Sequence, residues 1–134
     1  MRTKFAVVVA GIALLVAARP LVAHHSFSAE FDASKPFKMS GTVTKVEWMN
    51  PHTFFYIDVT DEKTKKVTNW AMEMGSPNGL MRQGWTRNTM KIGDVVSVEG
   101  SLAKDGSPTG NARSVTLPKT GQRLFAASSQ GVNP

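Results

Sequence analysis

The sequence predicts a mainly β protein: a small five- to six-stranded OB-like barrel with one short helix between strands 3 and 4. Two observations predict this fold class. Segments rich in β-branched and aromatic residues, several of them alternating apolar and polar, follow one another with polar loops between them. A helix-start motif falls between the third and fourth segments, which is the element order of an OB-fold. A five-stranded sandwich with an incidental helical turn would give nearly the same order and stays the alternative.

The first two strands are expected on either side of Asn50-Pro51, which breaks the β pattern. Residues 41–48 are rich in β-branched side chains, which favour strands. Residues 52–60 alternate, so their side chains point to two faces in turn. The face that we expect in the core carries Phe55, Ile57 and Val59. The opposite, polar face carries His52, Phe54, Tyr56 and Asp58.

A third strand is expected at 67–74, after a polar hairpin loop, and Ser76-Pro77 then predicts the helix. A Ser side chain can cap free N–H groups, and proline at the first helical position gives up a donor that has no partner there. Gly84 is expected to end the helix after about two turns. Trp70, Met72 and Met74 share one face of this strand, and we expect Leu80 and Met81 near the core and Trp85 packed at the exit of the helix.

The remaining strands are expected after the turn at 92–94. Residues 95–102 alternate, which places Val96, Val98 and Leu102 on the core face. A loop at 104–108 precedes a fifth strand at 112–117, and 122–125 is a candidate for a short sixth strand.

The start of the chain is typical of a signal peptide, expected over residues 1–23. Arg2 and Lys4 precede an apolar run at 5–18, which is shorter than the roughly 20 residues of a membrane-spanning helix. Leu21-Val22-Ala23 favours cleavage after Ala23, and the mature protein would then be periplasmic or secreted, with no permanent membrane span. An uncleaved anchor is the alternative. We expect the mature chain to consist of an N-terminal arm at 24–38, the barrel domain at 39–125 and a flexible tail at 126–134.

Charge and cysteine content exclude several classes of partner and site. The formal net charge is +6, but three basic residues lie in 1–23, so the rest of the chain carries only +3. Its one run of basic residues is Lys63, Lys65 and Lys66, which does not indicate a nucleic-acid partner. The absence of cysteine excludes disulfides and thiolate metal sites, so a metal would need His, Met, carboxylate or amine ligands.

The three histidines are the strongest candidates for a site. Cleavage after Ala23 would make His24 the N-terminal residue, whose amine and imidazole can chelate one metal ion together. With His25 beside it and an imidazole from His52, these nitrogens form a candidate copper site, because nitrogen sets with tetragonal geometry suit Cu(II).

Other interpretations of these residues stay open. Zinc, the second choice, would prefer a tetrahedral set of the histidines and a carboxylate such as Glu30 or Asp32. Met72 and Met74 could bind Cu(I), although methionines in strands more often fill the core. A solvated chain end and a turn histidine that bonds the backbone would explain the same residues without metal.

Aromatic side chains offer a second candidate site. Phe54 and Tyr56 on the polar face, with Trp48 nearby, could form a ligand-binding face on which a planar ligand stacks. The alternative is that these rings bind no ligand and are covered by Phe27 and Phe31 of the N-terminal arm.

Motifs spread over nearly the whole mature chain carry a family resemblance. They are His24-His25-Ser26-Phe27, Glu30-Phe31-Asp32, Gly41-Thr42-Val43, Trp48-Met49-Asn50-Pro51-His52, Gly75-Ser76-Pro77-Asn78-Gly79, Gly84-Trp85, Gly93-Asp94 and Ala112-Arg113-Ser114. With them the chain resembles a family of exported bacterial proteins known only as a domain of unknown function. The resemblance implies a secreted, single-domain, barrel-like β protein and carries over no activity.

We therefore expect a periplasmic, non-catalytic binding protein that holds copper through His24, His25 and His52. The alternative is a metal-free interaction module that binds an unknown periplasmic protein or envelope ligand on the aromatic face. The sequence lacks a Gly-x-Ser-x-Gly elbow and a His-Glu-x-x-His motif, so we do not expect an enzyme. A copper-dependent oxidase would need an open coordination position that the sequence does not place.

Overall fold

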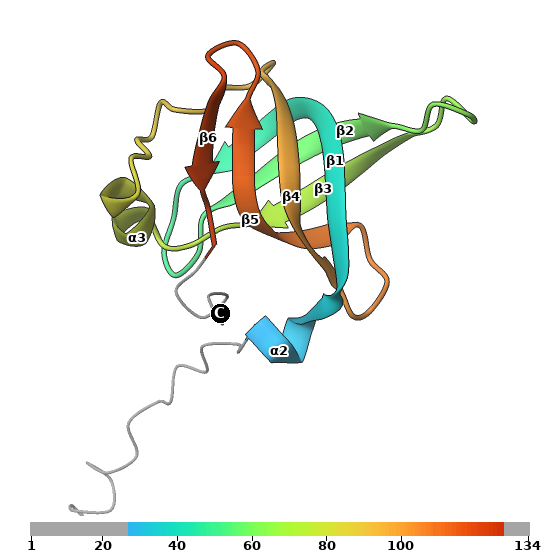
Figure 1. The fold of residues 1–134 in the computed structure, drawn as a ribbon, viewed down its shortest axis with the longest axis horizontal. Helices are drawn as coiled ribbons and strands as arrows, with labels where there is room; N and C mark the ends of the chain where they lie inside the picture. The colour runs from blue at the N-terminus through green and yellow to red at the C-terminus, as the bar shows by residue number, and fades with distance from the viewer. Residues whose placement is uncertain (1–26, 128–134) are drawn as a thin grey trace, which may run out of the picture.

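The computed structural model describes residues 27–127. Figure 1 shows the strands curving around one core, with a short helix beside them and another below them. The elements are α2 (Phe27–Glu30), β1 (Phe31–Glu47), β2 (Phe54–Thr60), β3 (Val67–Glu73), α3 (Pro77–Arg82), β4 (Val95–Ala103), β5 (Thr109–Leu117) and β6 (Gln122–Phe125). Among residues 27–127, no helix is long and apolar enough to span a bilayer.

The strands are hydrogen-bonded in a ring. Their order is β3-β2-β1-β4-β5-β6, and a parallel pairing of β3 with β5 joins the two halves of the sheet. The other pairings are antiparallel, and β6 pairs with β5. With α3 between β3 and β4, the predicted fold class is confirmed: the domain is mainly β, with OB-like element order.

The beginning of β1 differs from the prediction. We expected an extended arm to Lys38, but β1 starts at Phe31, where it pairs with Ala103 of β4. The register shifts between Asp32 and Pro36, and the Asp32 carboxylate accepts a hydrogen bond from the Ser34 backbone N–H at 2.9 Å. This irregularity interrupts the alternation that marks a strand, which explains why the sequence pattern concealed it.

A second short helix, α2, also lies within the expected arm. The Phe27 ring stacks on Phe31 with 5.7 Å between centroids, and Phe31 is buried. The aromatic side chains of the segment therefore anchor it, as expected. They do so from a helical turn and the start of a strand rather than from an extended arm.

The core lies inside the ring, on the strand faces that the alternation predicts, except at the end of β4, where Ala103 is buried and Leu102 is only partly buried. Phe55, Ile57, Val96 and Val98 are fully buried, whereas Val59 is partly buried. Met72 and Met74 are buried on the same side as the partly exposed Trp70. Within the described part, the buried hydrophobic core is completed by Phe31, Val43, Leu80, Trp85, Met90, Ala103, Ala112, Val115, Leu117, Leu124, Ala126 and Ala127.

The helix α3 begins as predicted. The Ser76 side chain accepts a hydrogen bond from the Gly79 N–H at 3.2 Å, and Pro77 occupies the first helical position. Gly84 follows the helix with φ 92°, a left-handed conformation that suits glycine. Met81 was expected near the core, but it is 51% exposed because it lies on the outer side of a short helix.

Replacing Ser76 by alanine should lower the free energy of unfolding by about 1 kcal/mol, because the cap on the Gly79 N–H is lost. Urea unfolding followed by circular dichroism measures this. Ser40→Ala, at an exposed position of β1, is the control and should change stability by less than about 0.5 kcal/mol. Equal stability of the Ser76 variant and wild type would show that the cap does not contribute.

The residue that follows β6 is also packed more closely than expected. The tail was predicted to start at Ala126, yet Ala126 is fully buried and its N–H donates to the Arg113 carbonyl at 2.8 Å. Its own carbonyl accepts from the Gly75 N–H at 2.9 Å. Ala126 thus joins β5 to the end of β3. Residues 128–134 of the predicted tail, and the predicted signal peptide at 1–23, lie outside the described residues.

Candidate functional site

His52 lies just before β2, where the pairing of β2 with β3 continues beyond the strand ends. The Thr53 N–H donates to the Gly75 carbonyl at 3.0 Å, and the Met74 N–H donates to the Thr53 carbonyl at 2.8 Å. These two bonds fix the backbone next to His52 against the end of β3. The segment before it contains a cis Asn50-Pro51 peptide bond.

The His52 ring has a defined orientation. Its Nδ1 lies 3.1 Å from the Met74 carbonyl oxygen, and the imidazole is 24% exposed. A carbonyl oxygen can only accept, so Nδ1 must carry the proton and donate. In the neutral ring, Nε2 then keeps its lone pair. No residue within 27–127 forms a hydrogen bond with Nε2.

Glu73 is the charged group next to this ring. Its Oε1 lies 3.6 Å from His52 Nδ1, and its side chain is only 12% exposed. The sequence alone did not predict that Glu73 lies beside His52. Its position between Met72 and Met74, both buried, was the available signal, because a residue between two core-facing residues of a strand points outward.

Glu73 belongs to a row of residues that are paired across adjacent strands on the outer side of the ring. Glu47 pairs with Phe54, Phe54 with Glu73, and Glu73 with Asn111 of β5. Asn111 is only 3% exposed although it lies on the outer side, and its Nδ2 has no hydrogen-bond partner among the described residues. The outer surface beside His52 is therefore polar and largely covered, rather than a fully solvated strand face.

The predicted aromatic face is only partly assembled. Phe54 and Tyr56 lie half-buried on the outer side of β2, as the alternation predicts. Trp48 instead packs against the core, on the side that Val46 also faces. A register shift between Val43 and Lys45 precedes these residues and sets which of them point inward. Trp48 is thus not part of the face.

Tyr56 is held by its neighbours on β1. Its hydroxyl donates to Glu47 Oε2 at 2.9 Å, and the Lys45 ammonium lies over the ring, 5.2 Å from its centroid. Hydrogen bonds from Lys45 and Tyr56 hold the pKa of Glu47 below its usual value. Burial, followed by the bond to Glu47, raises the pKa of the Tyr56 hydroxyl. The pair therefore stays as a neutral phenol and a carboxylate, an arrangement that orders this face.

The described residues include only part of the predicted set of metal ligands. His24 and His25 lie outside the described residues, so the structure places only His52 of the three. Within residues 27–127, no group of three or more His, Asp or Glu side chains comes together. Of the carboxylates considered for zinc, Asp32 is occupied by hydrogen bonds from the Ser34 N–H and hydroxyl.

The methionines considered as Cu(I) ligands are also placed. Met72 is fully buried and Met74 is 1% exposed, both within the hydrophobic core. Their role as core filler is therefore the one that the structure supports.

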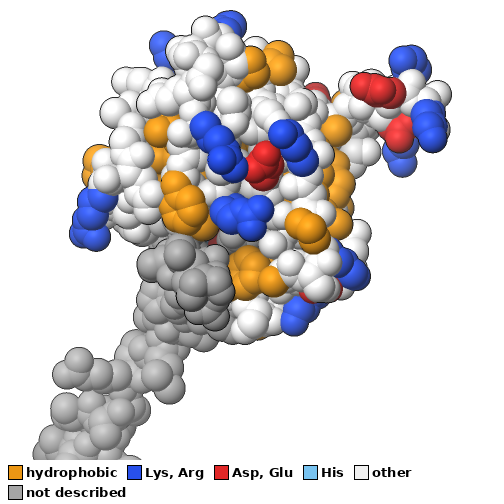
Figure 2. Space-filling view, viewed as in Figure 1, with side chains coloured by type: hydrophobic (Ala, Val, Ile, Leu, Met, Phe, Trp, Pro, Cys, Tyr) orange, Lys and Arg blue, Asp and Glu red, His pale blue; other side chains and the backbone are white. Residues whose placement is uncertain are grey.

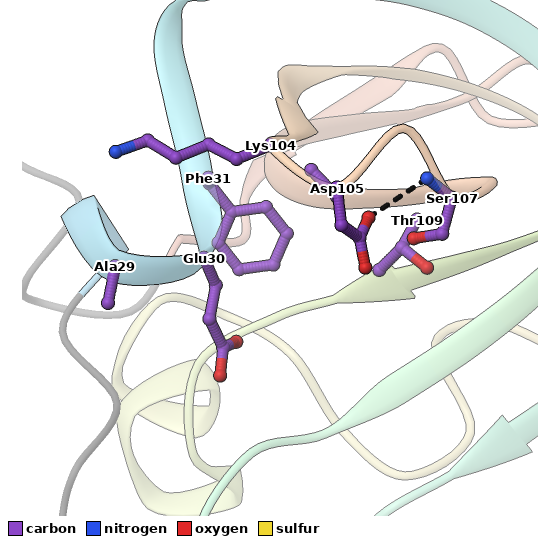
Figure 3. Close-up of a pocket in the computed structure, with 8 residues that line it drawn as sticks. Ala29, Glu30, Phe31, Lys104, Asp105, Ser107 and Thr109 are labelled. Carbon is purple, nitrogen blue, oxygen red and sulfur yellow. Dashed lines mark hydrogen bonds between the residues drawn. The ribbon is translucent and has the colours of Figure 1, made fainter.

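A cavity of about 330 Å³ lies between α2 and the loop that joins β4 to β5. Figure 3 shows the Phe31 ring between the helix and this loop, with Asp105 bonded to the Ser107 N–H. The Lys104 ammonium donates to the Ser28 carbonyl at 2.6 Å, which ties the loop to the helix. The described residues that line the cavity are a mixture of polar and apolar residues: Ala29, Glu30, Phe31, Ala103, Lys104, Asp105, Ser107 and Thr109.

Comparison with known proteins agrees with the resemblance seen in the motifs. No curated protein matches the chain. The model of a family of unknown function, DUF6152, matches residues 12–113. This span covers the predicted arm, the strands β1–β4 and most motifs of the resemblance. The predicted membership in an uncharacterised family is confirmed: the chain belongs to the family of unknown function DUF6152.

Proposed function

We propose that this protein is exported and binds copper without catalysing a reaction, through the nitrogen atoms of His24, His25 and His52. In this proposal His24, made N-terminal by cleavage after Ala23, supplies its amine and its imidazole. His52 supplies Nε2.

The orientation of the His52 ring is the observation that supports this proposal most strongly. Histidines that bind metals almost always donate their other ring N–H to a backbone carbonyl or a carboxylate, which fixes the tautomer and the ring plane. His52 has both kinds of group on that side, the Met74 carbonyl at 3.1 Å and Glu73 at 3.6 Å. The ring is thereby prepared to offer Nε2 to a ligand from outside.

The residue types favour copper over zinc. The chain contains no cysteine, and Met72 and Met74 lie in the core, so the ligand set consists of nitrogen atoms. Copper(II) binds nitrogen ligands more tightly than the other divalent first-row metals and accepts a tetragonal set. Zinc would need a tetrahedral fourth ligand, and Asp32 is already engaged by Ser34.

Replacing His24 by alanine should lower the Cu(II) affinity by more than about 100-fold, since losing a ligand should cost more than the 10- to 100-fold effect of a second-shell change. Competition titration against a Cu(II) chelator measures this, with protein purified from the periplasmic fraction of cells that express the full chain. Tyr56→Phe is the control, because it alters the same outer face and removes no ligand. Unchanged affinity in the His24 variant would contradict the proposal, because copper would then be held by other ligands.

A further inference from the structure

A second polar surface lies on the outer side of β1, β4, β5 and β6, apart from His52. Lys38 of β1 pairs with Glu99 of β4, Glu99 pairs with Ser114 of β5, and Ser114 pairs with Phe125 of β6. The row therefore crosses four adjacent strands, over about 14 Å.

A β-bulge adds a second cation to this row. Gly100 pairs with Ala112, whereas Glu99 pairs with Ser114, so Arg113 is an extra residue between the two pairs. Ala112 and Val115 are both fully buried in the core, so the two residues between them face outward. Arg113 is exposed there beside Ser114.

The carboxylate in the row organises the cations around it. Glu99 forms ion pairs with Lys38 at 3.2 Å and with Arg123 at 2.6 Å, and Arg123 also donates to the Ser114 hydroxyl at 3.1 Å. The Lys38 and Arg123 side chains nevertheless stay 71% and 61% exposed. With Arg113, the row has three cations for one carboxylate, so it keeps an excess of positive charge.

Figure 2 shows this arrangement from outside: basic side chains surround an acidic one near the middle of the face, with hydrophobic side chains beside them. The cations lie on the surface of a sheet. Neither of two cavities lined by described residues, one beside α2 and one beside the loop after Thr89, is lined by any of the three. A broad anionic surface can meet all three cations together.

We propose that Lys38, Arg113 and Arg123 form a basic surface by which the protein docks onto the phosphate headgroups of an anionic phospholipid membrane. A membrane surface presents many anionic headgroups at once, which matches the charge of the row. Phe125, half-buried at the end of the row, adds an apolar side chain of a type found at membrane interfaces. This inference does not depend on copper binding.

Vesicle co-sedimentation tests this inference, using periplasmic protein and vesicles of equal parts phosphatidylglycerol and phosphatidylcholine. The wild-type protein should bind these vesicles and dissociate from them at high salt. It should bind pure phosphatidylcholine vesicles far more weakly. Arg113 forms no ion pair with the residues that the structure describes, and Arg113→Glu should weaken binding by about 30-fold, because each unit of charge contributes about fivefold. Adding Lys38→Gln should weaken it about fivefold further, while Arg123 still pairs with Glu99.

Matched variants in the loop between β2 and β3 separate this surface from net charge. Lys63→Glu and Lys63→Glu/Lys66→Gln change the charge by the same amounts at exposed positions and should keep most of the binding. Equal losses in both sets would overturn the inference, as would failure of wild type to bind anionic vesicles. Displacement from vesicles by millimolar inorganic phosphate would also overturn it, because the surface would then be a site for a single anion.

Discussion

Replacing His52 by alanine should lower the Cu(II) affinity of the processed protein by more than about 100-fold. His52 is the one histidine among the described residues 27–127, and the Met74 carbonyl holds its protonated Nδ1, which would leave Nε2 for a metal. Its loss should therefore cost more than the 10- to 100-fold attributed to second-shell changes. Chelator competition gives the affinity, and electron paramagnetic resonance of the Cu(II) form should show fewer coordinated nitrogens.

Glu47→Gln is the matched control for this variant. Glu47 lies in the same outer row as Glu73, on the other side of Phe54, and it pairs with Tyr56 and Lys45 rather than with His52. Its substitution should leave Cu(II) affinity within about threefold of wild type, because it lies outside the set that orients the ring. If His52→Ala kept the wild-type affinity, the ligands would be confined to the N-terminal histidines.

Replacing Ile57 by alanine should lower the free energy of unfolding by about 2 to 5 kcal/mol, because the side chain is fully buried and its removal leaves a cavity. Chemical denaturation measures this loss. Ile92→Ala removes the same atoms from a side chain that is 72% exposed and should cost less than about 0.5 kcal/mol. Similar losses in both variants would mean that the buried face of β2 is assigned wrongly.

Much of this fold could be predicted because local patterns and packing agree. Alternation placed Phe55 and Ile57 inside, and the Ser76-Pro77 pair marked the start of α3, where the structure has them. The start of β1 could not be predicted in the same way. Its alternation is broken where residues between Asp32 and Pro36 leave the register with β4.

The site was harder to predict than the fold, because it depends on which strands become neighbours. Alternation placed His52 at the polar side of β2, but Glu73 and the Met74 carbonyl reach it only through the pairing with β3. Trp48 was expected near Phe54 and Tyr56, but it packs against the core, because a register shift earlier in β1 changes the facing of later residues.

The basic surface shows the same limit more strongly. Along the sequence, Lys38, Arg113 and Arg123 are far apart, so a search for runs of basic residues found only the loop with Lys63 and Lys65. The three come together through pairings of four strands, and the bulge at Arg113 has no sequence signature of its own.

One measurement tests the copper proposal most directly: intact mass and metal content of the protein purified without chelators from the periplasm of cells that express the full chain. We expect a mature chain that begins at His24 and carries about one copper ion per molecule. A chain that begins elsewhere would lack the His24 amine as a ligand. Protein that begins at His24 but takes up no copper, even after incubation with Cu(II), would contradict the proposal.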